Sequence, residues 1–94
     1  MGKEIISCEI SFVPIETQNY IEDVEKVLTL ISDSGLKYQT NAFSTIISGT
    51  PDTIFSLLKE ISTKMCETTK FIMITKISNV CGCTIEMSDK EKYK

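Results

Sequence analysis

The chain has 94 residues, of which 41% are hydrophobic and 24% are charged. These values are typical of a soluble globular domain and exclude disorder as the default state. Lysine supplies all ten basic residues, and thirteen acidic residues bring the formal net charge to −3. Without arginine the bidentate guanidinium contacts to phosphates and guanine are missing, which argues against a nucleic-acid partner. Histidine is also absent, which excludes Ser–His, Cys–His and histidine-based zinc chemistry.

Hydropathy and cysteine usage indicate a cytoplasmic protein. No apolar run approaches the roughly 18 residues that a membrane span needs, and Glu9 interrupts the N-terminal apolar run, so we expect neither membrane insertion nor a signal peptide. In an unexported chain the four cysteines are expected to be reduced thiols, with Cys8 and Cys66 as small core residues.

The first half of the chain predicts a strand and a helix. Residues 4–13 alternate with a period of two, which predicts a strand closed by Pro14. One face of that strand carries Ile6, Cys8, Ile10 and Phe12. Asn19 and Glu22 resemble a capping box at the start of a helix, and Gly35 is placed to end that helix.

The second half repeats this pattern. Two strands are predicted at residues 36–41 and 44–48, around a short connection. The segment 50–52 (Thr-Pro-Asp) is typical of a helix start, and residues 70–78 form a strongly apolar strand. A short final strand is predicted at residues 83–87. The order β-α-β-β-α-β predicts an α+β, ferredoxin-like sandwich over residues 1–94, with both helices on one face of an antiparallel sheet.

The opposite sheet face is expected to be covered as well. Residues 71–77 place apolar side chains on both faces of their strand, and Ile5 and Val13 add two more on the side away from the helices. A strand that is apolar on both faces is normally covered on both. We therefore expect a homodimer or homotetramer that forms through sheet faces, with C2 symmetry as the preferred operator.

The candidate binding groups are short polar side chains on the predicted strands. Glu9 lies in the middle of the first strand between Ser7 and Ser11, and it is either a solvated residue or an acceptor for the amino group of a heteroaromatic ring. Tyr38 could stack on a ring or simply pack on a neighbour. Further hydroxyl and amide groups on the next two strands are Thr40, Asn41, Ser44 and Thr45.

Two other classes of function are weaker. Cys81 and Cys83 could chelate a soft metal, with a methionine thioether as a further ligand. However, the loop after the first strand lacks the cysteine pair of ferredoxin-like metal chaperones. An enzyme is disfavoured, because no glycine-rich phosphate loop and no nucleophile beside a recognisable base is present.

Three segments resemble the small thiamine-binding proteins of the YkoF-like family. The most specific is Ser34-Gly-Leu-Lys-Tyr-Gln39, which continues through residues 41–49. The opening segment 9–14 matches the first-strand pattern of that family, and the segments 83–86 and 92–93 are similar to its closing part. The resemblance extends over nearly the whole chain.

The resemblance implies a ferredoxin-like protein that pairs through its sheets and binds thiamine or its hydroxymethylpyrimidine moiety without catalysis or a cofactor. The matching residues are Glu9, Ser11, Tyr38, Ser44 and Thr45. By this resemblance Glu9 accepts from the exocyclic amine, the three hydroxyl groups bond the ring nitrogens or the hydroxymethyl group, and Tyr38 walls the pocket. The ligand would lie on the helix-free sheet face at a subunit interface, and the role would be carriage, storage or sensing. The alternatives are a structural or regulatory oligomerisation module with another small ligand, and a cysteine-based soft-metal carrier.

Overall fold

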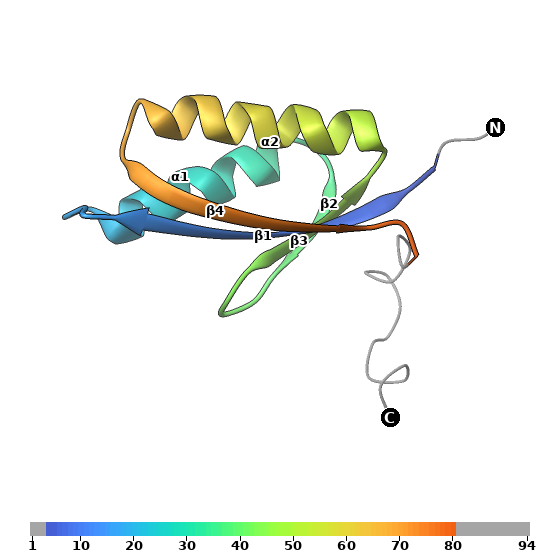
Figure 1. Cartoon of the computed structure of the whole chain (residues 1–94), viewed down its shortest axis with the longest axis horizontal. Coiled ribbons are helices and arrows are strands. Elements are labelled where there is room, and N and C mark those ends of the chain that lie inside the picture. Colours follow the sequence, from blue (N-terminus) through green and yellow to red (C-terminus); the bar gives the residue numbers. More distant parts are fainter. Residues whose placement is uncertain (1–3, 81–94) are drawn as a thin grey trace.

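The structure, a computed structural model, describes residues 4–80. Four strands and two helices follow one another in this part of the chain (Figure 1). They are β1 (Ile6–Ile15), α1 (Tyr20–Asp33), β2 (Lys37–Thr40), β3 (Thr45–Gly49), α2 (Pro51–Cys66) and β4 (Lys70–Ser78). The predicted strand at residues 83–87 lies outside the described residues.

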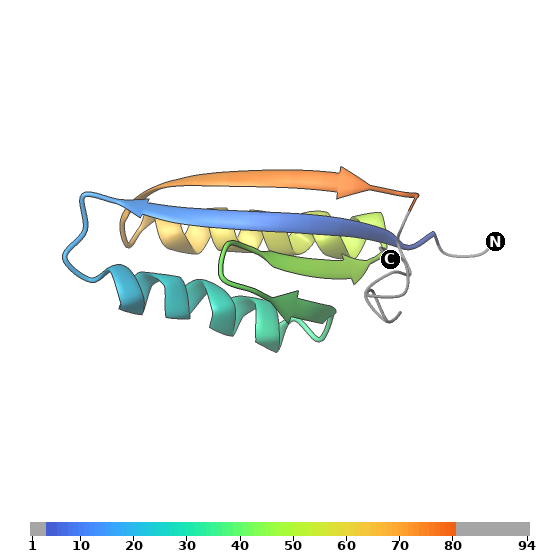
Figure 2. The same ribbon diagram turned by 90° about the horizontal axis from the view of Figure 1, so that it is seen from below.

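The strands form an antiparallel sheet in the order β2-β3-β1-β4. Both helices lie on one face of this sheet, and the other face carries no helix (Figures 1 and 2). This arrangement confirms the predicted α+β, ferredoxin-like fold. The two central strands are β3 and β1, so residues in the middle of β1 have a strand on either side.

The core fills the space between the helices and the sheet. Its fully buried side chains come from alternate positions of β1 and β3 and from one stripe on each helix. They are Ile6, Cys8, Ile10, Val27, Ile31, Ile47, Ile54, Leu57, Ile61 and Met65. The period of two in β1 therefore marks the face that packs against the helices, as predicted.

The end of β1 and the start of α1 differ from the prediction. β1 continues through Pro14 to Ile15, because beyond Ile10 it pairs with β4 alone and such a one-sided edge tolerates a residue without an N–H. Asn19 occupies the N-cap position of α1, but its side chain makes no capping bond. The Thr17 hydroxyl instead accepts from the Asn19 amide at 2.9 Å, the amide that Glu22 would bind in a capping box, and donates to the buried Asp23 carboxylate at 2.8 Å.

The other helix ends follow the prediction. Gly35 has φ of +83°, the left-handed backbone that glycine adopts without steric cost after a helix. At the start of α2 the Thr50 hydroxyl accepts from the Thr53 amide at 3.3 Å, and Pro51 occupies the first helical turn. The last residue of α2, Cys66, is exposed, so its predicted place in the core is wrong.

The helix-free face combines polar and apolar side chains. Its residues follow from the pairing register, because directly opposed residues point to the same side of a sheet. Apolar side chains exposed on it include Ile5, Val13, Ile72 and Ile74. A second subunit over this face remains a prediction. Within residues 4–80 neither helix is both long and apolar enough to cross a bilayer.

Candidate functional site

Glu9 stands in the middle of the helix-free face. Its neighbours across the sheet are Ile46 on β3 and Lys76 on β4. The Ser44 hydroxyl donates to Glu9 Oε2 at 2.8 Å, and Lys76 Nζ lies 3.8 Å from Glu9 Oε1. Each carboxylate oxygen offers about two lone-pair positions, so both oxygens keep room for a further donor. The Glu9 side chain is 39% exposed and accessible to a ligand.

The β2–β3 hairpin holds Ser44 in place. The side-chain oxygen Asn41 Oδ1 accepts from the backbone amides of Phe43 at 2.7 Å and Ser44 at 2.9 Å. The backbone amide of Asn41 donates to the Ser44 carbonyl at 2.9 Å. The Ser11 hydroxyl donates to the Phe43 carbonyl at 3.5 Å, which links β1 to the hairpin tip. An asparagine that accepts two successive amides is a common way to stabilise a tight turn. The serine that bonds Glu9 thus sits on an organised turn.

The structure brings together three of the five predicted site residues. Glu9, Ser11 and Ser44 gather where β1 passes the hairpin. With Lys76 they form what we call the Glu9 cluster.

The other two residues lie on the opposite face of the sheet. Tyr38 is directly opposite the buried Ile47, and Thr45 is directly opposite the buried Ile10, so both share the face that carries the helices. The structure therefore does not bring these two residues to Glu9, and their part in binding remains a prediction. The reason is the strand register: neighbouring residues such as Ser44 and Thr45 point to opposite sides of a strand, so only one of them can reach Glu9.

Lys76 was missed by sequence reasoning. It is the charged residue that the register places opposite Glu9, within a mainly apolar stretch of β4. Its position in that stretch was a signal, but the sequence alone does not specify which residue of β4 faces Glu9. At 80% exposure and 3.8 Å, the ion pair contributes only about 0–1 kcal/mol.

Apolar side chains border the Glu9 cluster. Ile74 lies opposite Ser11, and Ile72 lies opposite Val13, all on the helix-free face. Ile74 is 56% exposed, and Ile72 and Val13 are exposed as well. A negative charge beside a flat apolar strip suits a planar ring that carries an amino group, since the ring covers the strip and the amine donates to the carboxylate.

Cys8 lies next to Glu9 in the sequence but on the core side. Burial raises the pKa of its thiol from 9.0 to about 11, and the Glu9 charge adds to the rise. The thiol is therefore neutral and unreactive at neutral pH. Residues 4–80 contain no cluster of acidic or cysteine side chains suited to hold a metal ion, and Cys81 and Cys83 lie outside the described residues.

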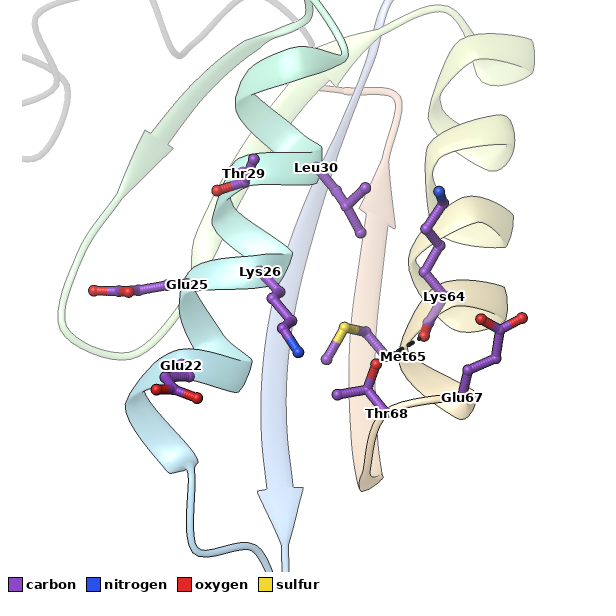
Figure 3. A pocket seen from close by; sticks show the side chains of 9 residues that line it. All are labelled: Glu22, Glu25, Lys26, Thr29, Leu30, Lys64, Met65, Glu67 and Thr68. Atoms are coloured by element: carbon purple, nitrogen blue, oxygen red, sulfur yellow. Dashed lines mark hydrogen bonds between the residues drawn. The ribbon is translucent and has the colours of Figure 1, made fainter.

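Two of the cavities border the helix side of the sheet. The larger, about 620 Å³, is an open groove between α1 and α2. In Figure 3 Leu30 and Met65 point into the space between the helices, and lysine and glutamate residues also line the groove. None of the five predicted site residues lines this groove.

The smaller cavity, about 260 Å³, lies between α1 and the β2–β3 hairpin, and we call it the hairpin cavity. Thr45 and Ser44 are among its lining residues. It was not predicted, because the gap depends on how far the hairpin stands from α1, which no pattern in the sequence specifies.

Comparison with known proteins agrees with the fold. A protein of Thermotoga maritima described as a putative thiamine biosynthesis/salvage protein is 25% identical, with a TM-score of 0.80 over 96% of this chain and 99% of that chain. A domain of unknown function from Bacillus cereus is 23% identical, with a TM-score of 0.76 over 98% of this chain and 92% of that one. A hypothetical protein from Methanocaldococcus jannascii is 22% identical, with a TM-score of 0.77 over 96% and 95%. The proteins from Bacillus cereus and Methanocaldococcus jannascii share the fold of this chain.

No curated protein matches this sequence. The family model described as "Thiamine-binding protein" matches residues 8–94, which include the whole Glu9 cluster. The chain therefore belongs to the thiamine-binding protein family.

Proposed function

We propose that this protein binds thiamine or its hydroxymethylpyrimidine moiety, without catalysis, on the helix-free sheet face where two subunits meet. The observation that supports this most directly is the Glu9 carboxylate, which stands among exposed apolar side chains with acceptor positions to spare. An aminopyrimidine offers the exocyclic amine that such a carboxylate takes and the flat ring that the apolar strip covers. Family membership favours the same ligand.

Each residue of the Glu9 cluster has a separate role in this proposal. Glu9 accepts from the exocyclic amine, and Ser44 keeps the carboxylate oriented through its 2.8 Å bond. Ser11 lies two residues from Glu9 on the same face and can turn its hydroxyl from the Phe43 carbonyl, 3.5 Å away, to a ring nitrogen. Lys76 is bound loosely enough to move aside, because its exposed ion pair contributes little.

A second subunit would complete the site. The ring has the sheet on one side only, and exposed isoleucines on β4 continue the apolar surface beyond the cluster. A partner sheet placed over this face would enclose the other side of the ring and strengthen its hydrogen bonds by excluding water. The protein would then act in carriage, storage or sensing of the ligand within the cytoplasm.

The test is calorimetric titration of thiamine and of hydroxymethylpyrimidine into the wild type and the Glu9→Gln variant. A hydrogen bond to a charged group contributes about 1.5–3 kcal/mol, so the variant should bind about 10- to 100-fold more weakly. Glu16→Gln is the matched control, because Glu16 pairs with a β4 lysine in the same way, Lys70 at 3.0 Å, but away from the cluster. Equal affinity of wild type and Glu9→Gln removes Glu9 from the site, and absence of binding to the folded wild type refutes the function.

One observation favours a second candidate, a structural oligomerisation module. Both Glu9 oxygens already have protein partners, Ser44 and Lys76, as expected if the face simply packs against another subunit. In that case the wild type would self-associate, and neither thiamine nor hydroxymethylpyrimidine would change its melting temperature. A ligand at 100 times its dissociation constant adds about 2.7 kcal/mol to the stability, so binding would be plain in the same experiment.

A further inference from the structure

The groove between α1 and α2 has the features of a small-molecule site. Its volume of about 620 Å³ lies within the range of roughly 300–1,000 Å³ that is typical of ligand pockets. Its floor is apolar, because the partly buried Leu30 of α1 and the buried Met65 of α2 point into it (Figure 3). The groove lies on the helix side of the sheet, so a subunit over the helix-free face would leave it open (Figure 2).

Lys26 brings a positive charge to this groove. In Figure 3 its side chain extends from α1 into the space between the helices, whereas Glu25 and Glu67, which also line the groove, point away from it. Among the residues that the structure describes, Lys26 forms no ion pair. The two other charged residues of the lining, Glu22 and Lys64, have opposite charges. The groove thus presents one uncompensated ammonium group beside an apolar floor.

A carboxylate on an alkyl chain matches this arrangement. The carboxylate would accept from the Lys26 ammonium group, and the chain would cover the floor and remove apolar surface from water. None of the nine described residues that line the groove is aromatic, and the flexible Leu30 and Met65 side chains adapt to a chain better than to a flat ring.

We propose that the groove between α1 and α2 binds an alkyl carboxylate, with Lys26 Nζ on the carboxylate and with Leu30 and Met65 against the chain. An inorganic anion gains only the contact with Lys26, and a neutral hydrocarbon gains only the contact with the floor. The ligand therefore needs both parts. This site shares no residue with the Glu9 cluster, and it does not depend on the proposed function.

The test compares octanoate, butanoate and 1-octanol by amide chemical shifts of the ¹⁵N-labelled full chain. Octanoate should shift amides at residues 26–30 and 64–68 in a saturable manner. Butanoate lacks four methylene groups that would cover the floor, so it should bind at least about 10-fold more weakly. The alcohol keeps the chain but lacks the charge, and it should bind about 3- to 6-fold more weakly, as expected for an exposed ion pair.

A substitution of Lys26 tests the role of its charge. Lys26→Met removes the ammonium group and keeps an unbranched side chain. It should weaken octanoate about 3- to 6-fold while it changes 1-octanol by less than about twofold. Lys59→Met, at an exposed lysine of α2 outside the groove lining, is the matched control and should bind both probes as the wild type does.

A second variant tests the location. Thr68 is exposed and lines the groove just after α2, so Thr68→Phe fills the groove and should abolish the shifts caused by octanoate. Thr63→Phe adds the same ring to an exposed position of α2 outside the lining and should leave them intact. Glu9→Gln should also leave them intact, so failure of the Glu9 proposal is seen separately.

Four results would overturn the proposal. They are the absence of saturable shifts with octanoate, equal affinity for butanoate and octanoate, binding by Thr68→Phe at the wild-type level, and a Lys26→Met variant that binds octanoate as the wild type does or weakens both eight-carbon probes equally.

Discussion

The buried thiol of Cys8 makes the stability of this protein depend on alkaline pH. Its pKa is raised from 9.0 to about 11 in the folded state, first by burial and then by the Glu9 charge. Between these values the unfolded chain has lost the thiol proton and the folded protein still holds it. Stability from this group is therefore complete below pH 9 and is lost as the pH rises toward 11. Two pKa units correspond to about 2.7 kcal/mol, and about 2 kcal/mol of this is lost by pH 10.5.

The assay is urea unfolding of the wild type and Cys8→Ala at pH 7.5 and at pH 10.5, with reductant present. Lysines and tyrosines also titrate in this range, so the informative quantity is the difference in unfolding free energy between the two proteins. Cys8→Ala is less stable at neutral pH because it leaves a small cavity, and the difference should shrink by about 2 kcal/mol at the higher pH. Cys66→Ala, at an exposed cysteine, is the control. A difference that stays constant with pH refutes the reasoning.

Two further predictions concern the sheet face and a helix end. Ile74→Lys places a charge on the exposed apolar strip, so it should weaken self-association at least 10-fold in sedimentation equilibrium. Ile21→Lys, at an exposed position of α1, is the control and should leave self-association unchanged. Equal association of both variants would exclude the helix-free face as the interface. Gly35→Ala should cost about 1 kcal/mol in thermal unfolding, because alanine is strained at φ of +83° although nothing lies within 4 Å of its methyl group, and an unchanged melting temperature would contradict this.

Alternation and capping signals were sufficient to predict the fold. The period of two in β1 gave the correct buried face, because hydrophobic burial selects one side of a pleated strand. Thr50 and Gly35 marked helix ends through local chemistry that needs no tertiary information. The predicted capping box failed in part because the Thr17 hydroxyl, from the preceding loop, accepts from the Asn19 amide that Glu22 would bind in such a box. The pattern alone does not decide between these two local partners.

The candidate site was predicted only in part, for reasons of register. Glu9 and Ser44 are 35 positions apart, and their contact depends on how β3 aligns with β1. A shift of one residue in this alignment would have turned Thr45 toward Glu9 and Ser44 toward the helices. Only one of the two side chains can therefore lie beside Glu9, and predicting both left the strand register unspecified. Lys76 depended in the same way on the alignment of β4.

The sheet order has a consequence for how the chain reaches this fold. β1 and β4 lie side by side with nine paired positions, yet the nearest of these pairs, Ile15 with Lys70, is 55 residues apart. In the β2–β3 hairpin the nearest pair, Thr40 with Thr45, is five residues apart. Closing the longer loop costs about 2 kcal/mol more in chain entropy. The most extensive strand pair of the sheet thus forms late, because its two strands come from opposite ends of the described chain.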